Sequence, residues 1–273
     1  MIRLSGFADE IAADPAVQIE VLQSEGIRFL ELRGAWGKNV LDFSDIEWED
    51  LRRRLHDAGL GVSAIGSPIG KVPIDGSWPD HVARFRIALD AAAFFAAPYI
   101  RLFSFYPPKG GRIADHREEV IRRLNEQVAL AKGRKVKLLH ENEKDIYGET
   151  TDACLDIARS VKGMDLIFDP ANFVQAGVRP AEAWPRLADH VAYFHIKDAI
   201  FGTGQVVPAG EGDGALAETL RNAIQQRGYE GYLSLEPHLA TAGKFSGFSG
   251  PDLFKRAVRA LKRILDEIGA SYS

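Results

Sequence analysis

Four side chains that can bind a metal or move a proton each end a short apolar run. Glu141 ends Lys-Leu-Leu-His-Glu, Asp169 ends Leu-Ile-Phe-Asp, His195 ends Ala-Tyr-Phe-His and Glu236 ends Leu-Ser-Leu-Glu. Three carboxylates and an imidazole gathered at buried strand ends would repel one another and be costly to desolvate. A divalent cation would relieve this conflict, and mixed oxygen and nitrogen ligands suit Mn²⁺, Mg²⁺, Co²⁺ or Zn²⁺.

Further polar residues follow the same or similar apolar runs. We expect contacts to a substrate from seven of them: Lys71, Arg101, Glu143, Asn172, Lys197, Asp198 and His238. If the runs are parallel strands of a barrel, their carboxyl ends open on one face and these side chains converge on one site. The competing interpretation is a network of salt bridges without a metal, in which the four residues above pair with Arg33, Lys71, Arg101 and Lys197.

The elements that must position these residues alternate regularly along the chain. The predicted strands are near-continuously apolar, as in parallel strands buried on both faces, and span residues 2–6, 29–33, 62–66, 99–105, 136–141, 166–169, 191–195 and 232–236. Segments with helical periodicity lie at residues 14–24, 45–58, 79–97, 115–132, 152–161, 180–187, 216–226 and 251–268. This alternation predicts a single (β/α)8 TIM barrel, although an open doubly wound sheet uses the same order. We see no linker or shift in composition, and we therefore expect one domain over residues 1–273.

The composition is that of an ordinary soluble globular protein, with 46% apolar and 26% charged residues. A net charge of -4 gives no reason to expect nucleic acid or an anionic membrane as a partner. We find no apolar run of about 18 residues and no signal-peptide pattern at the start, and we expect a cytoplasmic protein. The lone cysteine, Cys154, excludes an internal disulfide, and we expect it to be a core thiol.

Five segments resemble the xylose isomerase-like sugar phosphate isomerase/epimerase superfamily in order and spacing across almost the whole chain. They are His-Glu-Asn-Glu at 140–143, Phe-Asp-Pro-Ala-Asn at 168–172, Phe-His-Ile-Lys-Asp at 194–198, Pro-Ala-Gly-Glu-Gly-Asp-Gly at 208–214 and Leu-Glu-Pro-His at 235–238. The resemblance implies a TIM barrel, a carbohydrate substrate and one divalent ion, with Mn²⁺ foremost. It places the metal on Glu141, Asp169, His195 and Glu236, and it makes Glu141 and Glu236 the acid/base pair as well.

Departures from the family pattern narrow what the resemblance implies. The ketose 3-epimerases usually carry His where this chain has Asn172, Arg where it has Phe201, and a second Glu where it has Tyr147. These differences leave the metal site intact but argue against a specific ketose 3-epimerase assignment. The chain also lacks the extra histidines at strand ends that the multi-zinc endonuclease IV members use, which points away from a nucleic-acid substrate.

The shared chemistry of such a site is proton transfer beside a carbonyl. A C–H bond beside a carbonyl becomes acidic when a bound cation stabilises the negative charge that develops on the carbonyl oxygen. Two carboxylates on opposite faces of the enediolate could then epimerise one carbon or isomerise an aldose and a ketose. If a leaving group lies β to the carbanion, the same site would be a lyase on 3-oxo sugars or glycosides, of the C-deglycosidase type. A third alternative is a non-catalytic sugar-binding barrel, and a homo-oligomer is compatible with each of the three.

Overall fold

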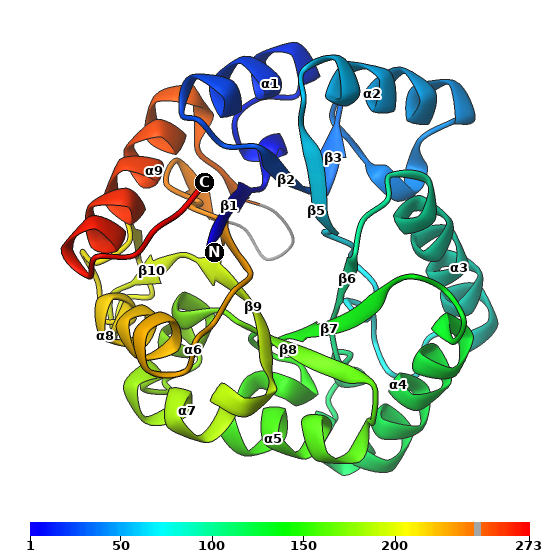
Figure 1. Cartoon of the computed structure of the whole chain (residues 1–273). Helices are drawn as coiled ribbons and strands as arrows, with labels where there is room; N and C mark the ends of the chain where they lie inside the picture. Colours follow the sequence, from blue (N-terminus) through cyan, green and yellow to red (C-terminus); the bar gives the residue numbers. More distant parts are fainter. Residues whose placement is uncertain (243–246) are drawn as a thin grey trace.

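Eight parallel strands surround a common axis in a computed structural model that describes residues 1–242 and 247–273 (Figure 1). The strands are β1 (Arg3–Gly6), β2 (Phe29–Leu32), β5 (Gly61–Ile65), β6 (Tyr99–Leu102), β7 (Lys137–Glu141), β8 (Met164–Phe168), β9 (Val191–Ile196) and β12 (Tyr232–Leu235). They follow one another around the sheet in the order β1-β12-β9-β8-β7-β6-β5-β2. A single bridge between Phe7 and Glu31 joins the two ends of this order. The predicted (β/α)8 TIM barrel is confirmed.

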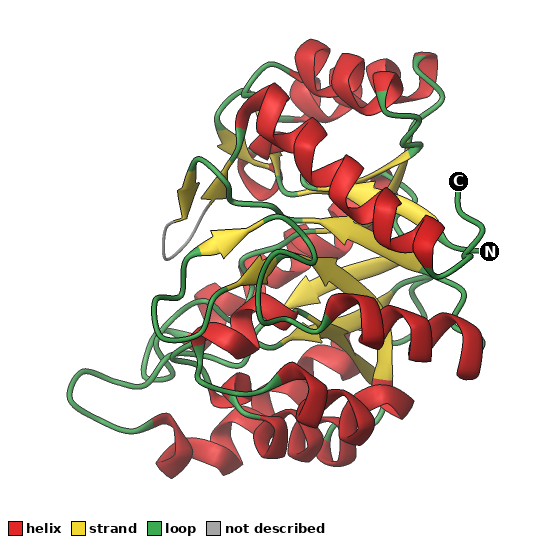
Figure 2. Cartoon of the chain, turned by 90° about the vertical axis from the view of Figure 1, so that its left-hand side faces the viewer, coloured by secondary structure: helices red, strands yellow, loops and turns green. Residues whose placement is uncertain are grey.

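Helices cover the outside of the strands, as the alternating pattern predicts (Figure 2). They are α1 (Pro15–Ser24), α2 (Asp45–Asp57), α3 (Trp78–Phe94), α4 (Arg117–Ala131), α5 (Thr151–Ser160), α6 (Pro170–Gln175), α7 (Pro180–Leu187), α8 (Leu216–Arg221) and α9 (Gly250–Glu267). Two differences from the prediction stand out. The short helix α6 follows β8 directly, and the helix expected over 216–226 changes to a π-helical turn at Asn222–Gln226.

Short strands and turns extend the loops at the carboxyl ends of the barrel strands. They include the hairpin of β3 (Gly34–Ala35) and β4 (Lys38–Asn39), the pair of β10 (Asp198–Ala199) and β11 (Val206–Val207), and the pair of β13 (Thr241–Ala242) and β14 (Gly247–Phe248). Both chain ends lie at the opposite end of the barrel, where Ser273 pairs with Ile2 and Leu4 (Figure 2). The loops after the strands are therefore the end at which a site can be built.

Side chains inside the barrel follow the two-residue period of a strand. In β9, Tyr193 and His195 point inward, and Phe194 between them packs outward against Phe168 and Trp184. Below His195, Tyr193 belongs to an apolar interior layer, and its hydroxyl lies 2.8 Å from that of Ser63. Side chains thus fill the interior beneath the strand ends, and the polar groups at those ends lie directly above a packed apolar layer.

The register between β2 and β5 shifts by one residue at the point where Glu31 sits. Leu30 pairs with Val62, but Glu31 pairs with Ala64, which leaves Ser63 as the extra residue of a bulge. Bulges of this kind re-aim a side chain and are frequent beside active sites. Here the bulge lies next to Glu31, a buried carboxylate that points into the barrel.

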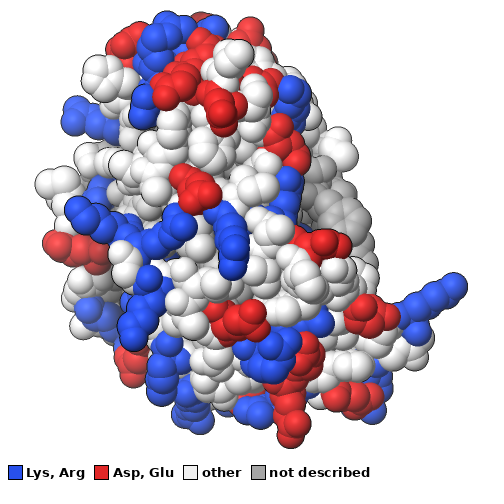
Figure 3. All heavy atoms as spheres, turned by 90° about the vertical axis from the view of Figure 1, so that its right-hand side faces the viewer, with Lys and Arg blue, Asp and Glu red and all other residues white. Residues whose placement is uncertain are grey.

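On the outer face over α3 and α4, basic and acidic side chains are interspersed, and Arg122 pairs with Glu119 and Glu126 (Figure 3). Cys154 is buried in α5, where its thiol donates to the carbonyl of Gly148 at 3.3 Å and burial raises its pKa to about 12. This agrees with the expected core thiol. In the described part of the chain, no helix combines the length and apolar character that crossing a membrane requires.

Candidate metal centre

The four residues expected to bind a metal come together at the carboxyl ends of four neighbouring strands. Glu141 is the last residue of β7, Asp169 follows β8, His195 lies near the end of β9 and Glu236 follows β12. One ligand atom from each lies within 4.8 Å of those of the others, and all four side chains are buried. We call these four residues the metal cluster; they could hold one ion.

The imidazole of His195 is oriented so that one nitrogen faces the three carboxylates. Its Nδ1 lies 3.2 Å from Glu141, 3.8 Å from Asp169 and 3.7 Å from Glu236. Its Nε2 lies 3.1 Å from Oε2 of Glu31, a buried residue of β2 across the barrel. A carboxylate that takes the far N–H of a histidine fixes its tautomer and frees the other nitrogen for a metal.

Asp169 is held in the same way, with one oxygen engaged and the other directed into the cluster. Its Oδ1 caps helix α6 by accepting the amide of Asn172 at 2.9 Å, while Asn142 bonds its backbone on both sides. Its Oδ2 lies 2.9 Å from Nζ of Lys197 and 3.8 Å from Nδ1 of His195, and neither this oxygen nor this nitrogen makes a hydrogen bond of good geometry. Two buried polar atoms that face each other without a well-formed hydrogen bond are a feature that a cation would satisfy.

Cations of the protein balance part of the negative charge around the metal cluster. Nζ of Lys197 lies 2.9 Å from both Asp169 and Glu236, and Nη1 of Arg101 lies 3.1 Å from Glu141 and 3.5 Å from Glu236. Arg33 lies between Asp9 at 2.7 Å and Glu236 at 3.2 Å. The salt bridges proposed as the alternative to a metal are therefore present for these three cations. The carboxylates that these three cations and His195 contact outnumber the three cations: Asp9, Glu10, Glu31, Glu141, Asp169 and Glu236.

The pKa values of the cluster reflect this excess of negative charge. Burial lowers the pKa of His195, but Glu31 and Glu141 more than offset burial and raise it to about 10. Burial raises the pKa of Asp169 to about 6, with Lys197 opposing and the neighbouring carboxylates adding to the rise. Glu141 differs, since His195 and Arg101 outweigh burial and lower its pKa to about 2. Without another cation, a protonated His195 supplies the missing positive charge.

Three of the predicted substrate-contacting residues lie at the mouth of the site. Lys71 pairs with Glu143 at 2.9 Å, and both side chains keep a small exposed fraction, 12% and 11%. His238, with 12% of its side chain exposed, has Nε2 at 3.1 Å from Glu10 and 3.6 Å from Glu236.

The other predicted contacts lie deeper. Asn172 donates to Oε1 of Glu141 at 3.0 Å and to the carbonyl of Asn142. Arg101 likewise donates to Glu141, and Lys197 donates to Glu236, so that all three residues contact carboxylates of the metal cluster.

Asp198, a predicted substrate contact, binds the loop that follows it. Its Oδ1 accepts the amides of Ala199 and Gly214, and its Oδ2 accepts those of Gly210 and Gly212, at 2.8 to 3.2 Å. Both oxygens are thus saturated by backbone. The carboxylate holds the glycine-rich loop at 208–214 in place, which argues against a direct contact with substrate.

Several residues of the site had no assigned role in the sequence. Glu31 and Glu10 are recognisable in the sequence only as polar residues near strand ends, Arg33 only as a cation of the alternative salt-bridge network, and Asn142 only as part of a motif. Glu31 orients His195 and Arg33 contacts Glu236. The signal for them is their position, because each follows the apolar part of β1 or β2 where burial makes a charge costly.

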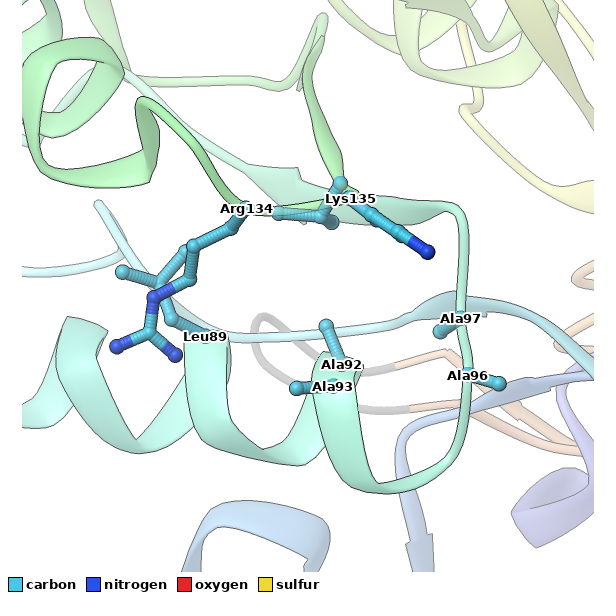
Figure 4. Close-up of a pocket in the computed structure, with 8 residues that line it drawn as sticks. Leu89, Ala92, Ala93, Ala96, Ala97, Arg134 and Lys135 are labelled. Carbon is cyan, nitrogen blue, oxygen red and sulfur yellow. The ribbon is translucent and has the colours of Figure 1, made fainter.

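A separate hollow of about 480 Å³ lies at the other end of the barrel, between the end of α3 and the start of β7. Figure 4 shows Arg134 and Lys135 on one side and four alanines on the other. No carboxylate or histidine lines it. The metal cluster and this hollow therefore lie at opposite ends of the barrel.

Residues 19–264 match the family described as Xylose isomerase-like TIM barrel. Because this match spans most of the chain, the protein belongs to that family. No curated protein matches the sequence at a significant level.

Solved structures with the same fold cover nearly the whole chain. A D-psicose 3-epimerase determined in the presence of D-fructose has 17% identity and a TM-score of 0.74, with 98% of this chain and 100% of that one covered. A probable 3-DHS dehydratase from Bacillus anthracis has 16% identity and a TM-score of 0.74, with 95% and 98% covered. A xylose isomerase-like TIM barrel protein from Mycobacterium smegmatis in complex with magnesium has 19% identity and a TM-score of 0.72, with 98% and 97% covered. At these identities the likeness concerns the fold.

Proposed function

We propose that the protein is a divalent-metal-dependent carbohydrate isomerase or epimerase that removes a proton beside a carbonyl. The observation that carries this proposal is the buried Nδ1 of His195, which has no hydrogen-bond partner and faces three carboxylates while Glu31 fixes the opposite nitrogen. Membership of the xylose isomerase-like family supports it, as do relatives named as a 3-epimerase and as a magnesium complex.

The residues present fit a metal ion of the Mn²⁺ or Mg²⁺ type. Glu141, Asp169, His195 and Glu236 would hold it through three oxygens and one nitrogen, a mixed set that suits these ions and also Co²⁺ or Zn²⁺. The excess of carboxylates over permanent cations gives the site the charge that such an ion neutralises. When bound, the ion supplies Lewis-acid stabilisation of the negative charge that develops on a substrate oxygen.

Glu141 and Glu236 are the groups we assign to proton transfer. Each presents one oxygen to the cluster and the other to Arg101: Oε1 of Glu141 faces His195 while Oε2 faces Arg101, and Oε2 of Glu236 faces Lys197 while Oε1 faces Arg101. One glutamate removes the proton from the carbon beside the carbonyl. Both glutamates are ionised in the free site, so the second must take up a proton from solvent before it returns one to the opposite face or to the neighbouring carbon.

Arg101 and Lys197 are suited to bind and steady the reacting oxygens rather than to exchange protons. Both are buried, and the carboxylates around them more than offset burial in raising their pKa values, so both stay charged. Lys71 and Glu143 at the mouth would contact hydroxyl groups of the sugar.

The test is hydrogen exchange at carbon in D2O. Mn²⁺-loaded protein is incubated with ketoses, among them D-fructose, and with 3-keto-glucosides, and deuterium incorporation is followed by NMR and mass spectrometry. This readout detects the first step whether the product is an epimer, an isomer or the product of elimination.

Matched variants separate proton transfer from metal binding. Glu141→Gln and Glu236→Gln should each abolish exchange, and Glu118→Gln on the exposed side of α4 should leave it unchanged. The metal content of each variant is measured in parallel, so that loss of exchange with metal still bound identifies the proton carrier. Exchange that persists in both site variants contradicts the assignment.

A further inference from the structure

A hollow of about 340 Å³ opens beside the metal cluster, over the first two strands of the barrel. Its lining comes from the turn after β1, the β3–β4 hairpin after β2 and the strand β14 after β12, and includes Asp9, Arg33, Gly34, Gly37, Asn39 and Phe248. Ligand pockets in proteins begin at roughly this size, about 300 Å³. The metal cluster comes from the ends of β7, β8, β9 and β12. The hollow and the metal cluster therefore share the segment that follows β12, which carries Glu236 and later β14.

Arg33 and Gly247 form the boundary between the hollow and the metal cluster. The guanidinium of Arg33 lines the hollow and also donates to Oε1 of Glu236 at 3.2 Å and to the carbonyl of Gly247 at 3.4 Å. Gly247 packs so closely on the ring of His238 that a Cβ there would overlap it. The hollow is therefore one side chain away from a proposed metal ligand.

The groups that line the hollow suit both the apolar C–H face and the hydroxyl groups of a sugar ring. Phe248 is 44% exposed, and its ring offers an apolar surface for the C–H face of a pyranose. Oδ1 of Asp9 is buried and accepts no hydrogen bond, although Oδ2 is bound by Arg33 at 2.7 Å. The Asp9 side chain is 23% exposed, so the carboxylate that Arg33 holds can accept a hydroxyl from the hollow through its exposed part, and such bonds are short and strong. Gly34 and Gly37 have no side chains, so the backbone itself forms the wall of the hollow at these two positions.

We propose that this hollow is a subsite for a sugar ring attached to the carbohydrate at the metal centre. The preferred substrate class is then a keto-disaccharide or similar glycoside rather than a free monosaccharide. The inference rests on the proposed function for the position of the first ring, while the second ring is held by Phe248, Asp9 and the glycine wall.

Binding of matched ketoses tests the subsite without reference to turnover. Mn²⁺-loaded protein is titrated by calorimetry with D-fructose and with four glucosyl-fructose isomers: turanose, maltulose, leucrose and isomaltulose. These differ only in the hydroxyl that carries the glucose. We expect at least one isomer to bind tenfold or more tightly than D-fructose, with saturation transfer in NMR to its glucose protons.

Two variants remove the subsite by different routes. Phe248→Ala deletes the stacking surface, and Ala13→Trp fills the hollow from an exposed position on its rim. Both should return the affinity of the disaccharide to that of D-fructose, while the affinities for D-fructose and Mn²⁺ stay unchanged. Ile46→Ala, at a side chain 81% exposed on α2, is the control for removing a surface hydrophobic residue.

The outcomes separate the two proposals. If Mn²⁺ binds but no disaccharide binds more tightly than D-fructose, or if the advantage persists in both variants, the subsite is overturned. A chain that binds none of the sugars overturns it as well. Failure to bind Mn²⁺ or to exchange carbon-bound hydrogen overturns the proposed function, whatever the disaccharides do.

Discussion

Oε2 of Glu31 and Nε2 of His195 face each other across the barrel at 3.1 Å, and neither side chain is exposed. Glu31 lies on β2, and the metal cluster comes from the opposite half of the barrel. The pair fixes which imidazole nitrogen faces the cluster. Glu31 is thus outside the group of candidate ligands but contacts one of them, His195.

Replacing Glu31 should therefore weaken metal binding without removing a ligand. We expect Glu31→Gln to lower the affinity for Mn²⁺ about 10–100-fold, the range found when an outer carboxylate partner of a histidine ligand is lost. Calorimetric titration measures the change, with Glu20→Gln on the exposed side of α1 as the control. An unchanged affinity in Glu31→Gln would show that the imidazole needs no such partner.

Metal removal should lower thermal stability through the same cluster. At a free Mn²⁺ concentration of 100 times Kd, binding adds about 2.7 kcal/mol to the folded state. For a chain of this size that corresponds to roughly 5–10 °C in Tm relative to the chelated protein. Asp169→Asn should reduce the shift to near zero, while Asp165→Asn, on the preceding strand β8 and paired with Lys137 near the surface, should retain it. Equal shifts in the two variants would place the ion elsewhere.

Asp198 should matter for the loop at 208–214 and not for the metal. Asp198→Ala leaves four buried or half-buried backbone amides without an acceptor, and we expect a loss of about 3 kcal/mol or more in the free energy of unfolding. Urea denaturation measures it. Glu211→Ala in the same loop removes a surface pair with Arg256 and should cost less than about 1 kcal/mol. If Asp198→Ala instead keeps full stability and loses only sugar binding, the predicted substrate contact was right.

His81 gives a pH dependence that is separate from the metal cluster. It is buried against Trp78 and Phe105, and burial, with a smaller contribution from Arg123, lowers its pKa from 6.5 to about 4. The folded state thus disfavours the protonated imidazole of His81. The contribution of this residue to the free energy of unfolding is therefore complete above pH 6.5 and is lost as the pH drops toward 4.

Between pH 7 and 4.5 this residue should account for a loss of about 2–3 kcal/mol in the free energy of unfolding. His81→Phe, which keeps an aromatic ring in the stack, should show a pH-dependent loss smaller by that amount in urea denaturation. His56→Gln, at an exposed position on α2, should follow the wild-type protein. The same pH dependence in His81→Phe and wild type would show that other groups carry it.

The strands and the metal cluster could be predicted because both depend on local sequence. A strand buried on both faces reads as an unbroken apolar run, and a charge at its end marks the open face, as at Glu141 after Leu138 and Leu139. In a parallel barrel, four such ends on consecutive strands must be neighbours.

The roles of Glu31 and Asp198 could not be predicted because they depend on contacts far apart in the chain. Glu31 points across the barrel beside the bulge at Ser63, and nothing in the sequence near residue 31 indicates His195 as its partner. Asp198 is bound by amides 12 to 16 residues later, where the loop folds back on the strand end. Its position beside Lys197 in a family motif suggested a ligand contact instead.

One backbone bridge joins β1 to β2, whereas β1 pairs with β12 over four consecutive residues. That bridge ends on Glu31, the residue that orients His195. A fluctuation that parts the two strands would therefore displace the carboxylate that orients the imidazole, while the longer ladders of the cluster strands stay paired. The rate at which a bound ion escapes would then depend on how often the seam between β1 and β2 opens.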